Sequence, residues 1–493
     1  MRNQTPSFVV QTKLHLQDNV QRHLNKSFNI ANSVYNETLG FGLKRFSAMK
    51  KNPRYQELLE LRRVSRSQEI DNELKQIQMD YGLTKYQLST WVLARRKQNK
   101  AYQHLNSAEI QVIAENAYQT LSQVLFYKTK NVRFRTRYDR THSFRNRTNT
   151  TGTRLVVSEK PYIAYRLYLH KKSTFVDIPR CAFTPYQQTQ LARADKIKYV
   201  QIISKTIRGE KVYYLQIVCQ GIPVSKIQKG ESVTGIDPGI STVAYVSKNT
   251  CELVDLVPKN FVRKERLIKN LSRKLEQSRQ VNNPEAYNEN GTRKKNACLK
   301  PLSKRAKRLV IRKRKAYRSL CEDRRKLQGE LINCIVSLSA VIKIEELKTK
   351  NLQKRTRETR INPKTGRPFS KKRYGKAIFK AAPSRFRTLL VQRANSVGCE
   401  VEVILPTKTK PSQYNHITGE FNKKELKTRI YSLTEEISDI QRDLYSAFLI
   451  AHIKDDEYRN DELVEDFNEF YTNMKEHLEK LRQTPTRLSW YVK

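Results

Sequence analysis

The chain has 493 residues, of which 38% are hydrophobic and 29% are charged, and this composition excludes wholesale disorder and allows two to four structural units. Its 96 Lys and Arg residues against 47 Asp and Glu residues leave a net charge of +49, which favours a polyanionic partner. A ribosomal or chromatin-like basic protein is usually shorter and poorer in aromatic residues. We therefore expect a nucleic-acid-binding protein, because each phosphate that it neutralises releases a condensed counterion.

The seven cysteines occur singly, without a CxxC pair, so neither a disulfide framework nor a zinc ribbon is expected. The first residues lack the apolar segment of a secretion signal. The longest apolar stretch, 331–344, is interrupted by polar residues and is too short to span a bilayer. We expect a soluble, cytoplasmic protein without membrane contact, nucleoid-associated in a prokaryote.

The first 130 residues predict a short strand followed by a helical block. Residues 7–15 read as the strand. Apolar residues then recur with helical spacing, which predicts helices over 18–48, 54–78, 84–98 and 106–128. The last two begin with the capping patterns Thr84-x-x-Gln87 and Asn106-x-x-Glu109. The polar faces of this block are strongly basic.

From about residue 131 the pattern becomes strand-like and predicts a β-barrel or small sheet. The predicted strands are 153–157, 161–169, 174–178, 198–206 and 211–219, with a hairpin turn at 208–210. A basic loop, 132–147, leads into them. Its arginines, interleaved with Phe134, Tyr138 and Phe144, suit RNA, because phosphates attract the charge and bases stack on the rings. The arginines concerned are Arg133, Arg135, Arg137 and Arg145. The alternative is a basic loop with aromatic residues in the core.

The second half alternates strands and helices. The segment 234–247 predicts a strand, a Gly/Pro turn and a second strand, and further strands are predicted at 341–348 and 399–406. The predicted helices are 258–280, 301–339, 384–397 and 434–453. Nine of the fifteen residues from Lys304 to Arg318 are basic, and a second basic stretch lies in the loop 354–376. A charge run is ordinarily a solvated helix face, but this one lies between candidate catalytic strands. Candidate nucleic-acid contacts are Lys304, Arg305, Arg308, Arg312, Lys371, Lys372 and Arg373.

The tail changes sign, with ten acidic and two basic residues between Asp455 and Glu479. Its apolar residues fall at helical spacing, so we expect a helix that packs on the core or on a second subunit. These residues are Val464, Phe467, Phe470, Tyr471, Met474, Leu478 and Leu481. No internal repeat is visible.

Three acids stand where a ribonuclease-H-type site requires them. Asp237 follows an apolar strand in GIDPGIS, Glu345 ends the apolar segment VIKI, and Asp443 lies on a late predicted helix. Hydrolysis of a phosphodiester requires that water be activated and that charge be stabilised on the attacking and leaving oxygens. Two Mg²⁺ or Mn²⁺ ions held by carboxylates can meet both requirements. Taken singly, the acids have ordinary alternatives: a β-turn, a helix N-terminal acid and a surface ion pair. Their order and context together favour a nuclease.

The chain resembles the TnpB family of transposon-encoded proteins, which are related to the type V CRISPR effectors. The residues that carry the resemblance are GIDPGIS, IKIEELKTKNL at 342–352 and QRDLYSAFLI at 441–450, which correspond to the three RuvC motifs. FNIANSVYNETL at 28–39 and the segment 374–409 are also similar to the family. The resemblance covers most of residues 7–453.

The resemblance implies an α+β multidomain fold with a helical recognition lobe, a β-barrel wedge domain and an α/β ribonuclease-H-like (RuvC) nuclease domain. It implies a first wedge strand at 1–16, a recognition domain at 17–130, a wedge domain at 131–228, RuvC motifs I and II at 229–406, a degenerate insert at 407–433, and motif III with a helical tail at 434–493. The implied activity is RNA-guided, Mg²⁺-dependent (or Mn²⁺-dependent) cleavage of double-stranded target DNA by a monomer or homodimer. By position, Asp237, Glu345 and Asp443 are the implied catalytic and metal-binding acids, with Glu345 preferred over Glu346.

The chain departs from the family at the expected zinc ribbon. Tyr414, Asn415, Thr418 and Gly419 stand near the expected first cysteine pair, and no cysteine follows Cys399. A lone His416 cannot hold zinc, so we predict no structural Zn²⁺ there and an insert stabilised by packing or partly flexible.

Two positions near the implied active site bear on cleavage. Arg429 matches a basic family position and is a candidate contact of the scissile phosphate, whereas Tyr445 stands where Asn is common, which leaves cleavage efficiency open. Two alternatives to a nuclease are an RNA-guided DNA-binding repressor that does not cut and a guide-independent transposase or RNA-binding maturation factor.

Overall fold

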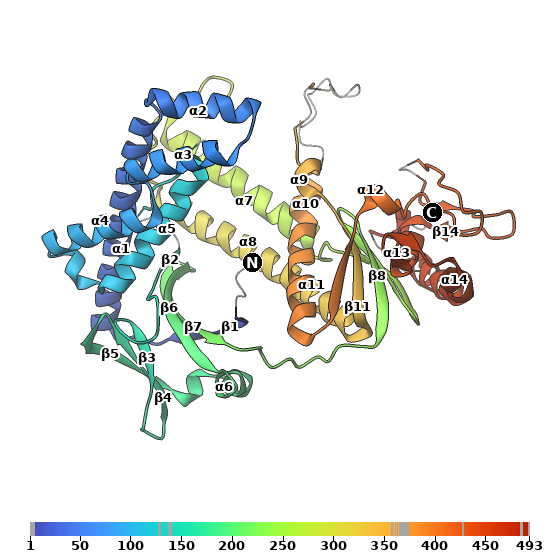
Figure 1. Cartoon of the computed structure of the whole chain (residues 1–493), viewed down its shortest axis with the longest axis horizontal. Helices are drawn as coiled ribbons and strands as arrows, with labels where there is room; N and C mark the ends of the chain where they lie inside the picture. Colours follow the sequence, from blue (N-terminus) through green and yellow to red (C-terminus); the bar gives the residue numbers. More distant parts are fainter. Residues whose placement is uncertain are drawn as a thin grey trace. The chain divides into compact units, whose positions relative to one another are not determined.

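The computed structural model describes residues 5–126, 129, 131–136, 141–355, 358–359, 361, 363, 374–425, 428–483 and 487–491. The chain divides into two compact units, Met1–Val224 and Ser225–Lys493 (Figure 1). Within these described ranges, no helix is both long enough and apolar enough to cross a bilayer.

Helices form most of the first half of unit 1. They are α1 (Asp18–Met49), α2 (Pro53–Val64), α3 (Gln68–Asp80), α4 (Lys85–Gln98), the short 3-10 helix η1 (Tyr102–His104) and α5 (Ser107–Leu125). Two short helices, η2 (Arg180–Ala182) and α6 (Pro185–Ala192), follow in the second half of the unit. Both predicted capping boxes form, at Thr84 with Gln87 and at Asn106 with Glu109. The single helix predicted over 54–78 is wrong. It is two helices, because Ser67 caps a new one by accepting a hydrogen bond from the Ile70 amide at 3.2 Å.

The strands of unit 1 form two open sheets. The strands are β1 (Ser7–Leu14), β2 (Thr141–Arg145), β3 (Arg154–Val157), β4 (Ile163–Leu169), β5 (Lys171–Pro179), β6 (Lys196–Ile207) and β7 (Glu210–Gln220). The first sheet has the order β1-β7-β6-β2, and the second has the order β3-β4-β5. The predicted hairpin turn is confirmed, with positive φ at both Arg208 and Gly209, as a two-residue turn of twisted strands requires.

The predicted β-barrel is not observed among the described strands. No ladder joins the two sheets, so each keeps two edges, whereas a barrel closes them. The sheets instead share one hydrophobic core, to which Leu167, Ile202 and Leu215 contribute. Residues of α1 also enter this core, among them Leu24 and Phe28. Two layers around a common core thus bury the apolar faces without closure.

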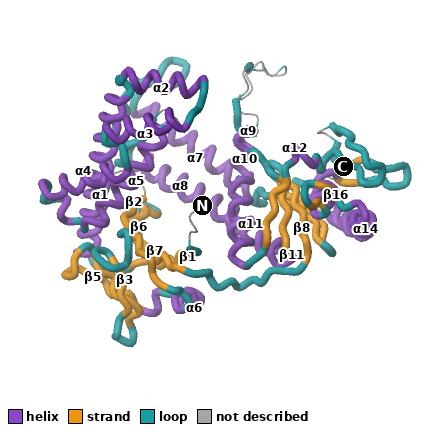
Figure 2. The backbone as a smooth tube through the Cα atoms, viewed as in Figure 1, coloured by secondary structure: helices purple, strands orange, loops and turns teal. Residues whose placement is uncertain are grey.

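A mixed five-stranded sheet forms the centre of unit 2. Its strands are β8 (Ser232–Pro238), β9 (Thr242–Ser247), β10 (Thr250–Asp255), β11 (Ser339–Glu345) and β12 (Glu400–Ile404), in the order β10-β9-β8-β11-β12. β8, β11 and β12 are parallel, and β9 and β10 run antiparallel to their neighbours. Figure 2 shows these strands gathered beside α11 and α14.

Helices cover both faces of this sheet. The longer elements are α7 (Phe261–Asn282), α8 (Lys304–Leu338), α11 (Pro383–Val397), α13 (Arg442–Ala451) and α14 (Asn460–Gln483). Shorter ones are η3 (Pro284–Ala286), α9 (Thr349–Leu352), α10 (Gly375–Ala381), α12 (Pro406–Thr409) and η4 (Ser489–Tyr491), with the small hairpins β13 (Ile430–Tyr431) and β14 (Ile440–Gln441), and β15 (Ile453–Lys454) and β16 (Glu457–Tyr458). α8 and α11 pack against Ile236 and Ile344, and α13 and α14 pack on the opposite face against Ala244 and Val246 (Figure 1).

The acidic tail packs on the core of unit 2, which was one of the two predicted alternatives; the other was packing on a second subunit. α14 buries Phe467, Phe470, Met474 and Leu478 in the cluster that also holds α13. Val464 was predicted to belong to this stripe, but it is 64% exposed. The tail helix therefore forms one layer of unit 2.

The helix predicted over 434–453 is wrong in its first half, since α13 begins at Arg442. Asp439 has a positive φ of 61°, which a right-handed helix excludes. Residues 440–441 pair with 430–431 as a short antiparallel hairpin instead. This break places Asp443 in the first turn of α13.

Candidate active site

Strand alternation directs Asp237 and Glu345 to the face of the sheet that α13 covers. A Cβ at Gly235, on β8, would lie 2.1 Å from the backbone oxygen of Ala447, so α13 crosses this strand at backbone contact. On β11, Lys343 Nζ donates to the backbone oxygen of Ile453, just after α13, at 2.5 Å. Asp237 and Glu345 follow these residues by two positions and share their face, because side chains alternate along a strand.

The register places the two acids side by side. β8 and β11 are parallel neighbours, and Ile236 is opposite Ile344. The next residues, Asp237 and Glu345, therefore stand at the carboxyl ends of adjacent strands, which are about 4.8 Å apart in a sheet. The structure thus brings together two of the three acids that the sequence singled out.

The third acid, Asp443, is held by two arginines. Arg429 Nη1 lies 3.3 Å from each carboxylate oxygen, and Arg442 Nη2 donates to Oδ1 at 3.1 Å. The 430–441 hairpin arranges this, since the Arg442 amide donates to the Arg429 carbonyl at 2.9 Å. The three side chains are only 14–17% exposed, so the pairs are well shielded from water. The alternative of an ion pair between Asp443 and Arg442 is therefore observed, but the pair is largely buried and includes Arg429 as well.

The acids act on one another electrostatically. Burial raises the pKa of Asp237 well above its ordinary value, and the negative charges of Glu345 and Asp443 raise it further. Burial also raises the pKa of Glu345 to about 7. The neighbouring Glu346 forms an ion pair with Lys348 at 3.2 Å. The preference for Glu345 over Glu346 as the catalytic acid stays a prediction.

The donor set fits Mg²⁺ or Mn²⁺. Three carboxylates offer only oxygen atoms, which these hard cations prefer, and a divalent charge would relieve the repulsion that raises the pKa of Asp237. Among the described residues, however, the carboxylate oxygens of these three acids do not all lie within 4.8 Å of one another. The two arginines hold the carboxylate of Asp443, so a cation has to compete with them for this ligand.

The basic loop of unit 1 presents two of its arginines beside aromatic rings. The Arg135 guanidinium lies 3.8 Å from the ring centre of Tyr35, and that of Arg145 lies 4.4 Å from the ring centre of Tyr199. Arg133 is exposed. Arg137 and Tyr138 lie outside the described residues.

The aromatic residues of this loop do not behave alike. Phe134 is 49% exposed, whereas Phe144 is 3% exposed and belongs to the core of the two sheets. The expectation that Phe144 stacks on RNA is therefore wrong. It faces inward because it lies on β2, a strand inside the segment that was predicted to be a loop.

The basic run on α8 is exposed. Lys304, Arg305, Arg308 and Arg312 all face solvent, and none of them forms an ion pair with a described acidic residue. Residues 305, 308 and 312 recur at the three- and four-residue spacing of one helix face. Such a row is suited to a phosphate backbone. Lys371, Lys372 and Arg373 lie outside the described residues.

The insert between β12 and α13 is anchored by aromatic packing. The ring of Tyr414 stacks on that of Tyr458 with centres 4.0 Å apart. His416 Nδ1 lies 2.7 Å from the hydroxyl of Tyr445, and the His416 amide donates to the same hydroxyl at 3.2 Å. Tyr445 therefore ties α13 to the insert. The expectation that this insert holds no zinc stays a prediction.

The sequence did not single out Arg442 or Lys424 as candidate site residues. Arg442 was read only as a partner in a surface pair, yet it grips Asp443. Lys424 Nζ lies 3.4 Å from the ring centre of Tyr431, and burial lowers its pKa to about 8. No sequence signal marks Lys424, because its burial beside Tyr431 depends on tertiary packing.

Comparisons with known proteins find similarity only at the level of solved structures. No protein-family model and no curated protein matches the chain. A Cas12f1 solved with sgRNA and target DNA is 12% identical with a TM-score of 0.47, over 88% of this chain and 83% of that one. A Cas12f ternary complex is 12% identical with a TM-score of 0.26, over 89% and 82%. A Cas12i1 R-loop complex is 10% identical with a TM-score of 0.25, over 94% and 64%.

Proposed function

We propose that the chain is an RNA-guided DNA endonuclease whose active site consists of Asp237, Glu345 and Asp443. The observation that carries the proposal is the juxtaposition of Asp237 and Glu345 at the ends of adjacent parallel strands, on the face of the sheet that α13 crosses. The raised pKa of both strand acids supports it, because clusters of unrelieved carboxylates are characteristic of metal-dependent sites. The TM-scores stated above lie below 0.5, so the proposal rests on the residues of this chain.

Each residue has a distinct role in the proposed site. Two Mg²⁺ or Mn²⁺ ions, when bound, stabilise charge on the attacking and leaving oxygens of a phosphodiester. Asp237, between the other two acids, would be the shared ligand, with Glu345 and Asp443 on either side. Arg429, which pairs with Asp443 in this structure, would contact the substrate phosphate when Asp443 serves as a metal ligand. The three acids are largely shielded from solvent, which limits competition between water and the substrate phosphate.

Guide RNA and double-stranded target DNA are the proposed partners. The net charge of +49, the exposed row on α8 and the arginines of the basic loop support polyanion binding. The motif resemblance to the TnpB family supports a guide mechanism, in which base pairing reads the target sequence. Whether the chain acts as a monomer or homodimer stays a prediction.

A cleavage assay with two matched variants tests the proposal. The chain is expressed together with its flanking DNA, the copurified RNA is sequenced, and a matching duplex is offered with Mg²⁺. We expect wild type and Glu346→Gln to cut, and Asp237→Ala and Glu345→Gln to lose more than about 100-fold in rate. Glu346 is a stringent control because it is one residue from Glu345 on the same strand end.

Other outcomes assign other functions. Guide RNA and target binding without cleavage by wild type would make the chain an RNA-guided binding protein. Equal cleavage by wild type and Asp237→Ala would remove the three acids from the mechanism. Absence of any defined copurified RNA would favour a guide-independent nucleic-acid-binding protein.

A further inference from the structure

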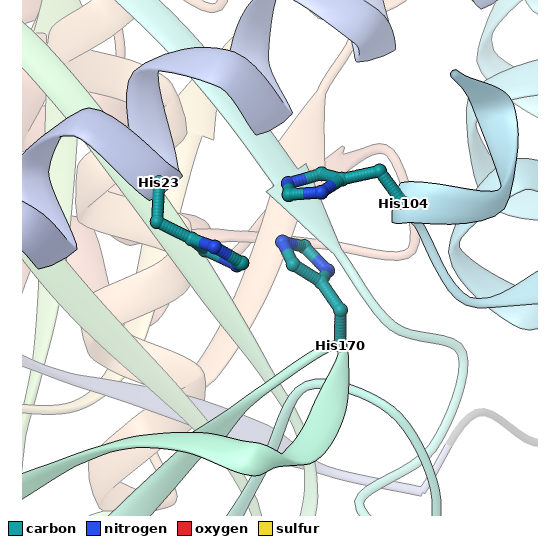
Figure 3. A group of neighbouring side chains, drawn as sticks. All are labelled: His23, His104 and His170. Atoms are coloured by element: carbon teal, nitrogen blue, oxygen red, sulfur yellow. The ribbon is translucent and has the colours of Figure 1, made fainter. Parts of the chain in front are cut away.

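Three histidines from distant parts of unit 1 meet at one point. His23 lies on α1, His104 ends η1, and His170 stands in the turn between β4 and β5. One ring nitrogen of each lies within 4.8 Å of the others, and Figure 3 shows the three rings turned toward one another. Among the described residues, no other group of this kind forms. The proposed catalytic acids belong to the other unit, so the cluster is a separate feature.

Two of the rings, those of His104 and His170, direct their Nε2 atoms toward the hydroxyl of Ser27. The hydroxyl oxygen of Ser27 lies 3.0 Å from His104 Nε2 and 2.8 Å from His170 Nε2. Ser27 is one helical turn after His23 and is fully buried. The two Nε2 atoms and the hydroxyl oxygen are therefore three closely spaced possible metal ligands beside the ring of His23.

A buried carboxylate orients His170. Its Nδ1 lies 2.6 Å from Glu109 Oε2, and the Thr153 amide donates to Glu109 Oε1 at 2.9 Å. The Asn106 amide donates to Glu109 as well, in the capping box of α5. A carboxylate only accepts hydrogen bonds, so this contact puts the proton of a neutral ring on Nδ1 and leaves the Nε2 lone pair directed at the cluster. Metal-binding histidines are commonly held by a carboxylate in this way.

The backbone at His170 is held in an unfavourable conformation. Its φ is +57°, in the left-handed region that non-glycine residues seldom adopt. His170 is also buried, at 5% exposure. Surrounding contacts must stabilise such a conformation, and one of them is the hydrogen bond that the His170 amide donates to the Thr153 hydroxyl at 3.2 Å.

We propose that His23, His104 and His170 bind one Zn²⁺-class divalent metal ion, with the Ser27 hydroxyl or a water as the fourth ligand. Nitrogen ligands favour such a cation over Mg²⁺, which prefers oxygen. Zn–N bonds of about 2.0–2.1 Å place two tetrahedral ligands roughly 3.4 Å apart. The Ser27 oxygen lies 2.8 Å and 3.0 Å from two of the ring nitrogens, so small shifts of this hydroxyl and of the rings complete the site. The ion would join the end of η1, the start of α1 and the β4–β5 turn, and so tie the helices of unit 1 to its sheets.

Zinc titration of the full chain tests the site. Asp237→Ala protein in excess Mg²⁺ is titrated with Zn²⁺ against a chromophoric chelator, so that the acids of unit 2 do not contribute. We expect one Zn²⁺ per chain with sub-micromolar affinity, and His104→Gln should weaken it by more than about 100-fold. Glu109→Gln should weaken it by about 10- to 100-fold, as loss of an orienting carboxylate does. His15→Gln, at an exposed histidine of the same unit, should leave the affinity unchanged.

Cobalt provides a readout that does not depend on how the variants fold. Co²⁺ bound to wild type should give the intense visible absorption of a tetrahedral site with nitrogen ligands. No Zn²⁺ uptake by this protein, or a weak octahedral Co²⁺ spectrum, would overturn the proposal and leave a hydrogen-bonded histidine network only. Unchanged Zn²⁺ affinity in a folded His104→Gln variant would overturn it as well.

Discussion

Adjacent side chains on one strand end meet very different surroundings. Glu345 points to the face that α13 covers, beside Asp237, while Glu346 lies one position on and pairs with Lys348. Strand alternation alone produces this difference. The proposed metal site therefore depends on the position of Glu345 itself, and the adjacent acid Glu346 cannot replace it.

Glu345 should make the free energy of unfolding depend on pH. Burial raises its pKa from 4.5 to about 7, so between these values the folded chain holds a proton that the unfolded chain has lost. Stability from this group is present at low pH and falls as pH rises through that window, by on the order of 3 kcal/mol. Urea unfolding in EDTA at pH 5 and pH 8 should show a smaller decline for Glu345→Gln than for wild type. Equal declines in the two proteins would contradict the burial of Glu345.

Arg429 should affect cleavage and metal binding in different ways. Arg429→Gln removes one of two cations that hold Asp443, so Mg²⁺ affinity of the free protein should stay the same or rise. The cleavage rate should fall about 10- to 100-fold because a charge near the phosphate is lost. Calorimetry and single-turnover cleavage measure the two effects, with Lys423→Gln at an exposed neighbouring cation as the control. Weaker Mg²⁺ binding with unchanged cleavage would contradict the role given to Arg429.

Among the elements, α13 and β8 form the contact on which the site depends. Gly235 lies beneath the backbone of Ala447 and Ala451, so a methyl group there has no space. Gly235→Ala should destabilise unit 2 by about 1–3 kcal/mol and move Asp443 away from the strand acids. Gly329→Ala on α8 is a matched control, since a Cβ there meets nothing within 4 Å and alanine favours a helix by about 1 kcal/mol. Thermal unfolding and cleavage assays of both variants measure the difference. Equal effects of the two changes would contradict the close crossing.

Periodicity was sufficient to predict most helices and strands, and its failures have local causes. The helix over 84–98 was predictable because Thr84 and Gln87 make a local capping box. The break at Ser67 and the late start of α13 after Asp439 were not, because a cap and a left-handed residue override an apolar pattern that continues through them. β2 was hidden because its pairing with β6 is a long-range contact within a basic segment.

The same distinction explains how much of the candidate site was predictable. Asp237, Glu345 and Asp443 were found because each stands beside a recognisable strand or helix. The ion pairs of Arg429 and Arg442 with Asp443 depend on the hairpin of β13 and β14, which no residue pattern predicts. The cluster of His23, His104 and His170 depends on three segments meeting in space, so isolated histidines gave no signal.

For the whole molecule, the charge of +49 predicts a strong effect of salt on nucleic-acid affinity. Each contacted phosphate should contribute a slope of about 0.9 to the fall of log affinity with log salt concentration on duplex DNA. Fluorescence anisotropy between low and moderate salt should therefore give a steep line, and changing Arg305, Arg308 and Arg312 together to Gln should reduce its slope. A nearly flat plot for wild type would contradict a basic binding surface.

The central claim is that Asp237, Glu345 and Asp443 share divalent ions, and anomalous scattering from Mn²⁺-soaked crystals tests it most directly. We predict adjacent Mn²⁺ peaks within bonding distance of Asp237, with Glu345 and Asp443 as further ligands and Asp443 released from Arg429. Fully occupied Mn²⁺ elsewhere in the crystal, with no peak at Asp237 and with Asp443 still paired to both arginines, would contradict the claim.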